Sequence, residues 1–101
     1  MSQDLFAPRA LRELRAAAIY IAKENAEAAE RFLTEAIRAA ERISANPMLA
    51  RVDSRFAPPR FRFWSLIPFH YLLVFDTKLD PPVVIRFVHQ ARDLPVILRD
   101  L

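Results

Sequence analysis

The chain has 101 residues, of which 53% are hydrophobic and 27% are charged, and its formal net charge is +3. It contains eight prolines but neither glycine nor cysteine. These absences exclude Gly-rich phosphate loops, the dinucleotide-binding fingerprint, disulfides, thiol nucleophiles and Cys-ligated metal sites.

The length suits a single domain over residues 1–101 that buries a sizeable core. Residues 1–8 lack the basic start and apolar run of a signal peptide. The most apolar stretch, residues 63–75, is too short to span a bilayer and is interrupted by Pro68. We therefore expect a cytoplasmic protein without a membrane segment, and we expect no catalytic, cofactor-binding or metal-binding residues.

Two long helices are predicted in the first half of the chain. Residues 2–6 precede them as a possible edge strand, and Pro8 suits the first turn of a helix. Apolar residues then recur at helical spacing at Leu11, Leu14, Ala18, Ile21 and Ala22. Asn25 is a candidate N-cap for a second helix, which Asn46-Pro47 ends. The apolar stripe of this second helix comprises Ala29, Phe32, Leu33, Ala36, Ile37, Ala40 and Ile43. The two helices form an αα-hairpin.

The second half reads as strands. Residues 60–63 alternate charged and aromatic side chains, as in a half-buried strand, and residues 71–75 are apolar on both faces, as in a central strand. Residues 83–88 predict a third strand, and Asp93 is placed to cap a short helix through Leu101. The fold class is therefore α+β, in the order β-α-α-β-β-β with a short C-terminal helix, and the helices lie on one face of a mainly antiparallel sheet.

Motifs along nearly the whole chain resemble the ParE branch of the RelE/ParE toxins of bacterial type II toxin–antitoxin systems. The His-x-Ala-Arg-Asp sequence at residues 89–93 is the most specific of them. The others, in order, are Ala10-Leu11-Arg12-Glu13-Leu14, Tyr20-Ile21-Ala22, Asn25, Ala28-Ala29-Glu30-Arg31-Phe32, Asn46-Pro47-Met48-Leu49, Trp64, Phe69 and Tyr71-Leu72-Leu73-Val74-Phe75.

The resemblance implies a toxin that inhibits DNA gyrase, so arresting replication and growth. It implies a ParD-like ribbon-helix-helix antitoxin that neutralises the toxin within a heterotetramer or larger complex. Contact with DNA is then expected only through the antitoxin or gyrase.

Three positions at which the family commonly has glycine carry other residues here, namely Ala50, Pro68 and Gln90. Where such a position needs a positive φ, a side chain adds a steric cost, and proline cannot adopt that conformation at all. We therefore expect the loop around Pro68 to depart from the usual family shape.

Eight residues are candidates for contact with the target or the antitoxin: Arg60, Arg62, Trp64, Phe69, Arg86, His89, Arg92 and Asp93. A lone buried guanidinium is costly, so we expect Arg86 on the open sheet face, in one cationic patch with Arg60 and Arg62. Some of the aromatic residues between 61 and 69 are expected to line a groove for the antitoxin. The opposing interpretation is that residues 89–93 only organise the turn before the last helix.

RelE-type relatives instead cut messenger RNA in the ribosome. That chemistry needs a base for the ribose 2′-hydroxyl, a cation for the phosphate and an acid for the leaving group. His89, Arg92 and Arg86 would supply parts of this set, but the C-terminal stretch lacks tyrosine and lysine and the helical half is neutral. We expect a binding protein rather than an enzyme. A ribosome-dependent endonuclease and a non-toxic antitoxin-binding relative are the alternatives.

Overall fold

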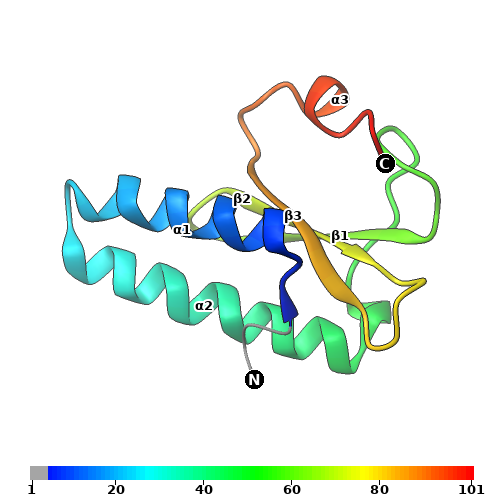
Figure 1. Ribbon diagram of the computed structural model, residues 1–101, viewed down its shortest axis with the longest axis horizontal. Helices are drawn as coiled ribbons and strands as arrows, with labels where there is room; N and C mark the ends of the chain where they lie inside the picture. The colour runs from blue at the N-terminus through cyan, green and yellow to red at the C-terminus, as the bar shows by residue number, and fades with distance from the viewer. Residues whose placement is uncertain (1–4) are drawn as a thin grey trace.

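The computed structural model describes residues 5–101, whose first half is the expected helical hairpin (Figure 1). Helix α1 spans Pro8–Ala22 and helix α2 spans Ala26–Ala45. The side-chain oxygen of Asn25 accepts a hydrogen bond of 3.0 Å from the backbone N–H of Ala28, so the predicted N-cap is confirmed. Beyond α2 the chain makes a short 3₁₀ turn, η2 (Pro47–Leu49), because Pro47 cannot continue the helix.

The buried face of α1 differs slightly from the predicted stripe. Ala10, Leu14, Ala17 and Ala18 are buried, whereas Leu11 and Ile21 are half-buried and Ala22 is exposed. The sheet and α2 contact α1 from two sides, and this broadens the buried face beyond a single row. On α2 the prediction holds more closely, with Ala39 as the addition and Leu33 and Ile37 only half-buried. The buried residues of α2 are Ala29, Phe32, Ala36, Ala39, Ala40 and Ile43.

Three strands form an antiparallel sheet in the order β1-β2-β3, which confirms the central position predicted for the second of them. All residues of β2 after Tyr71 are buried. The helical hairpin covers one face of the sheet and encloses the larger core, in which Phe32 packs edge-on to Phe87 and Tyr71. The strands span Phe61–Leu66 for β1, Tyr71–Asp76 for β2 and Val83–His89 for β3.

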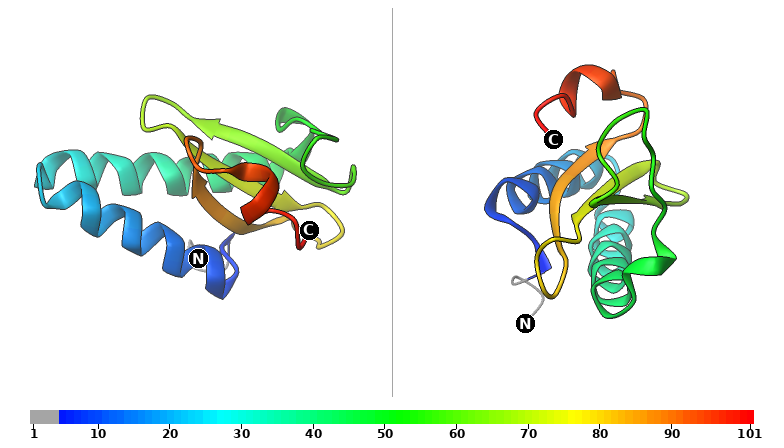
Figure 2. Two further views of the ribbon diagram at one scale, coloured as in Figure 1. Left: turned by 90° about the horizontal axis from the view of Figure 1, so that it is seen from above. Right: turned by 90° about the vertical axis from the view of Figure 1, so that its right-hand side faces the viewer.

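The opposite face of the sheet is not open. The short helix α3 (Leu94–Ile97) and the residues after it lie over that face (Figure 2), with the loop before β1 beside them. Leu98 is fully buried there against a second core of Phe61, Phe63, Leu72, Val74 and Val88. The expectation that all helices share one face is therefore wrong for α3.

The predicted N-terminal strand lies mostly outside the described residues. Within them, Phe6 forms one parallel bridge with Val84, and the N–H of Ala7 donates to the carbonyl of Val84 at 2.8 Å. Among residues 5–101, a positive φ occurs at His70, at 63°. The positions Ala50, Pro68 and Gln90 do not adopt one, so the left-handed residue of this turn lies two positions after Pro68.

Candidate functional site

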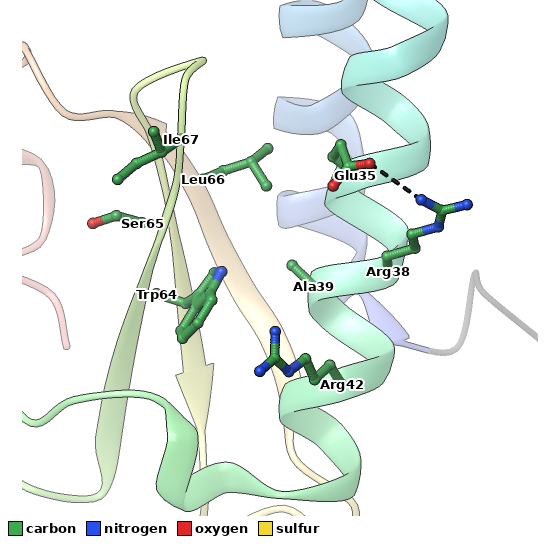
Figure 3. A pocket seen from close by; sticks show the side chains of 8 residues that line it. All are labelled: Glu35, Arg38, Ala39, Arg42, Trp64, Ser65, Leu66 and Ile67. Carbon is green, nitrogen blue, oxygen red and sulfur yellow. Dashed lines mark hydrogen bonds and ion pairs between the residues drawn. The ribbon is translucent and has the colours of Figure 1, made fainter.

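A groove of about 430 Å³ runs between α2 and β1 (Figure 3). Trp64 and Arg42 face one another across it, and the guanidinium carbon lies 5.8 Å from the centre of the indole ring. Leu66 is buried at its floor, whereas Ile67 is 75% exposed at its end. This α2–β1 groove is lined by Glu35, Arg38, Ala39, Arg42, Trp64, Ser65, Leu66 and Ile67.

The charges and the strand edge beside the α2–β1 groove favour an extended acidic partner. Glu35 and Arg38 form an exposed pair at 3.3 Å, while Arg42, the third charged residue of the lining, makes no ion pair with any residue in 5–101. The outer edge of β1 is paired at Phe63, whose N–H and C=O both bond to Arg51. Because alternate residues of a strand direct their backbone groups to the same side, those of Ser65 also point outward. An extended segment of a partner would be able to form backbone hydrogen bonds with this edge of β1.

A second hollow, of about 260 Å³, lies between α1 and β3 and is called the aromatic hollow below. The ring of Tyr71 stacks on Phe87 at 5.2 Å and meets His89 edge-on at 4.9 Å. Tyr20, 69% exposed, stands at the border. Burial, and then the nearby phenol of Tyr20, raise the pKa of Tyr71 above its usual 10.0. The full lining is Glu13, Ala16, Ala17, Tyr20, Tyr71, Phe87, Val88, His89 and Arg92.

His89 organises the turn that follows β3. Its Nδ1 accepts a hydrogen bond of 3.0 Å from the N–H of Ala91, and its carbonyl accepts one of 3.1 Å from the N–H of Arg92. An Nδ1 that accepts a hydrogen bond carries no proton, so a neutral ring is protonated at Nε2. The turn-organising interpretation of His89 is therefore supported by geometry, and Nε2 remains for other contacts.

Arg86 is buried, contrary to the expectation of an exposed cation. Its side chain is 5% exposed, and its Nε and Nη2 donate to the Glu13 carboxylate at 2.9–3.2 Å. Nη1 donates to the carbonyl of Ile97 at 2.6 Å. Arg86 does lie on the sheet face away from the hairpin, since it pairs with Val74, but the C-terminal segment covers that face. The Glu13 carboxylate and the Ile97 carbonyl offset the free-energy cost of burying the Arg86 guanidinium.

The Glu13 carboxylate has a second function at the edge of the sheet. It also accepts the backbone N–H of Phe87 at 2.8 Å, a donor on the outer edge of β3. Glu13 therefore holds α1, β3 and Arg86 together, and its oxygens are already occupied.

A third hollow, of about 280 Å³, adjoins α1, β3 and the C-terminal segment and is called the arginine hollow below. Arg9 pairs with Asp100 at 3.0 Å, while Arg92 and Arg99 make no ion pair with any residue in 5–101. Its lining is Arg9, Arg86, Arg92, Val96, Ile97, Arg99 and Asp100, so Arg92 borders both this and the aromatic hollow.

Asp93 precedes α3 as predicted, but its carboxylate does not cap the helix. The backbone carbonyl of Asp93 instead accepts the N–H groups of Val96 and Ile97 at 3.1 and 3.0 Å. The exposed carboxylate borders a separate hollow with Arg55, Gln90 and Arg92.

The predicted cationic patch does not form. Arg60 pairs with Asp76 at 2.8 Å, and Arg62 donates to the carbonyl of Ala50 at 2.8 Å. Phe61 and Phe63 belong to the second core, so Arg62 points to the hairpin side of the sheet while Arg86 points to the other. The two cations are separated by the sheet.

The predicted aromatic groove is present in part. Trp64 lines the α2–β1 groove, whereas Phe61 and Phe63 are buried. Phe69 is half-buried against the ring of Phe32 at 5.1 Å. Of the predicted aromatic candidates, Trp64 is therefore the one that lines a groove.

Sequence reasoning missed Glu13 and Tyr20. Glu13 adjoins Leu14 of the apolar stripe, so its carboxylate lies at the border between helix and sheet. Because a buried arginine needs a carboxylate partner, this position was a signal for Glu13. Tyr20 lies off the stripe beside Ile19, and both are exposed. The signal for Tyr20 was that it and Ile19 are two adjacent apolar residues on the outer side of a helix, a pattern typical of a binding surface.

Within residues 5–101, no three His, Asp or Glu side chains gather as metal ligands. No helix in the same range is long and apolar enough to cross a membrane.

Comparison with known protein families gives a match. The family described as the ParE toxin of the type II toxin–antitoxin system, parDE, matches residues 5–94. No curated protein shows a significant match. The matched range includes both helices, the whole sheet, the α2–β1 groove and the aromatic hollow.

Proposed function

The chain belongs to the ParE toxin family of parDE type II toxin–antitoxin systems, and on that premise we propose that a ParD-like antitoxin neutralises it and that its target is DNA gyrase. The observation that carries the proposal is the family match over residues 5–94. The chemistry of the aromatic hollow agrees with a toxin that acts by binding.

A nuclease would need a free base and acid beside the bound phosphate. In the aromatic hollow the Glu13 carboxylate is occupied by Arg86 and by the N–H of Phe87. Nδ1 of His89 is occupied by the N–H of Ala91. The Glu13 carboxylate and Nδ1 of His89 are thus committed to the fold and Arg86 is buried, whereas Arg92 and Nε2 of His89 are not committed in this way. This incomplete catalytic set favours gyrase binding over RNA cleavage.

The gyrase proposal is tested with purified gyrase and relaxed plasmid DNA. The purified chain is expected to inhibit supercoiling and to increase the amount of cleaved DNA, and induction without antitoxin is expected to stop growth. Normal supercoiling at saturating toxin would contradict the proposal. Transcripts cut at the ribosomal A site after induction would identify the endonuclease alternative, and a tight antitoxin complex without growth arrest would identify a non-toxic relative.

The α2–β1 groove is the proposed antitoxin site. It offers apolar surface at Trp64 and Ile67, a cation at Arg42 and outward-directed backbone groups at Ser65, which together suit an acidic amphipathic segment. The antitoxin is proposed to be a ribbon-helix-helix protein, and the complex to be a heterotetramer or larger. DNA contact is proposed to occur through the antitoxin's own domain or through gyrase.

Ile67→Asp tests this site because it places a carboxylate on its exposed apolar end. Affinity for the antitoxin, measured by calorimetry, is expected to fall at least tenfold, because a buried carboxylate without a partner replaces an apolar contact of the interface. Leu79→Asp is the matched control, since Leu79 is also exposed but lies in the turn at the other end of β2. Equal affinities of the two variants would exclude the α2–β1 groove.

A further inference from the structure

The aromatic and arginine hollows meet at Arg92, and their chemistries are complementary. One is bordered by Tyr20, Tyr71 and His89, and the other by Arg9 and Arg99. A nucleotide likewise joins a planar ring to an anion.

The aromatic hollow has the size and lining for one planar ring. Its volume of about 260 Å³ is just below the range of about 300–1,000 Å³ typical of pockets for drug-sized ligands. Ala16 and Ala17 on α1 leave this space unfilled. Tyr71 is held by Phe87, Phe32 and His89, while Tyr20 is largely exposed and therefore accessible to a stacked base. Base–aromatic stacking is a common basis of single-strand binding.

The arginine hollow has the charge for a phosphate. Arg86 and Arg9 are neutralised by Glu13 and Asp100, which fixes the wall of the hollow. Arg92 and Arg99 have no carboxylate partner among residues 5–101. Guanidinium groups bind phosphate oxygens through paired hydrogen bonds.

We propose that these two hollows together bind an unpaired nucleotide of a single-stranded nucleic acid, with the base against Tyr20 and the phosphate against Arg92 and Arg99. An acidic peptide would satisfy the arginines alone, whereas a nucleotide fills both hollows. The proposal goes beyond the gyrase and antitoxin assignments and depends on neither: it adds a direct contact with a single strand to the DNA contact proposed through the antitoxin or gyrase.

The test measures fluorescence anisotropy of a labelled oligothymidylate, its RNA counterpart and a DNA duplex of equal length, at low salt. The single strands are expected to bind more tightly than the duplex. Tyr20→Ala is expected to weaken single-strand binding roughly 5- to 100-fold, the range for loss of one stacked base, while Tyr20→Phe keeps the affinity. Arg92→Ala is expected to reduce the magnitude of the slope of the logarithm of the binding constant against the logarithm of the salt concentration by about 0.7, the value for one single-strand phosphate contact.

Matched controls separate this site from general charge and exposure. Ile19→Ala removes the neighbouring exposed side chain outside both hollows, and Arg31→Ala removes an exposed arginine on α2 that lies outside both hollows. Both variants are expected to bind like the unmodified protein. The DNA and RNA arms show which strand is preferred.

Three results would overturn the proposal. The first is unchanged affinity of Tyr20→Ala for the single strand, and the second is a duplex affinity equal to the single-strand affinity. The third is displacement of the labelled oligonucleotide by polyglutamate as effectively as by an unlabelled oligonucleotide, at equal concentrations of negative charge. Inhibition of gyrase supercoiling is measured separately for Tyr20→Ala. This keeps the two proposals distinguishable, because a variant that loses oligonucleotide binding can still be assayed for gyrase inhibition.

Discussion

At the scale of single residues, the Arg86 guanidinium is a buried ion held by side-chain and backbone acceptors. It donates to both oxygens of Glu13 and to the carbonyl of Ile97, with 5% of its side chain exposed. Moving an ion into a protein interior costs several kcal/mol, and the pair offsets this only while both partners are present. Each partner therefore depends strongly on the other.

Removing one partner is expected to destabilise the protein more than removing both. Glu13→Gln leaves Arg86 buried without its counter-charge and is expected to lower the free energy of unfolding by about 3 kcal/mol. The double variant Glu13→Gln with Arg86→Met is expected to recover part of this loss. Urea denaturation of the single and double variants measures the difference. Additive losses would show that the two side chains are not coupled.

His70 has a backbone conformation that glycine adopts more easily. Its φ of 63° places a Cβ atom close to the following carbonyl, at a cost of roughly 1–2 kcal/mol. His70→Gly is expected to raise stability by about 0.5–1 kcal/mol, since the gain is reduced by the greater freedom of glycine in the unfolded chain. His70→Ala retains the Cβ atom and is expected to bring no gain. Equal melting temperatures of the Gly and Ala variants would contradict this explanation.

At the scale of elements, local patterns were sufficient for the helices and the strands. Pro8, Asn25 and Asn46-Pro47 act through their nearest neighbours, so the ends of α1 and α2 were predictable. The strand β2 was predictable as the central one because it is apolar on both faces. The position of α3 was not predictable, because the sequence of residues 94–97 does not indicate which face of the sheet they cover.

The C-terminal segment is expected to be held on the sheet chiefly by Leu98, which is fully buried in the second core. Leu98→Ala is expected to cost about 2–5 kcal/mol and to increase binding of a hydrophobic dye, because it leaves a cavity beneath α3. Val96 in the same segment is 50% exposed, so Val96→Ala is expected to change stability by less than about 0.5 kcal/mol. Thermal denaturation followed by circular dichroism compares them, and similar melting temperatures would show that the segment is anchored elsewhere.

At the scale of the whole molecule, the contacts that build the candidate sites link distant parts of the chain. Glu13 and Arg86 are 73 positions apart, and only the packing of α1 along β3 brings them together. The expected patch of Arg60, Arg62 and Arg86 was wrong because strand register decides which sheet face a side chain takes. Trp64 and Arg92, which were predicted to contact a partner, line hollows of the fold, but the surfaces that they border required the complete fold. Their contact with a partner stays a prediction.

The link between Arg86 and the carbonyl of Ile97 has a consequence for synthesis of the chain. Synthesis releases the chain from its N-terminus, and within a domain contacts between residues close in sequence form faster than those between distant residues. Helix α2 with β1 and β2 lies within residues 26–76, whereas the shell of Arg86 needs Glu13, Ile97 and Asp100. The α2–β1 groove can therefore be assembled while the arginine hollow still awaits the last residues. If the α2–β1 groove is the antitoxin site, as proposed, the antitoxin binds a surface whose residues are synthesised before those that complete the arginine hollow.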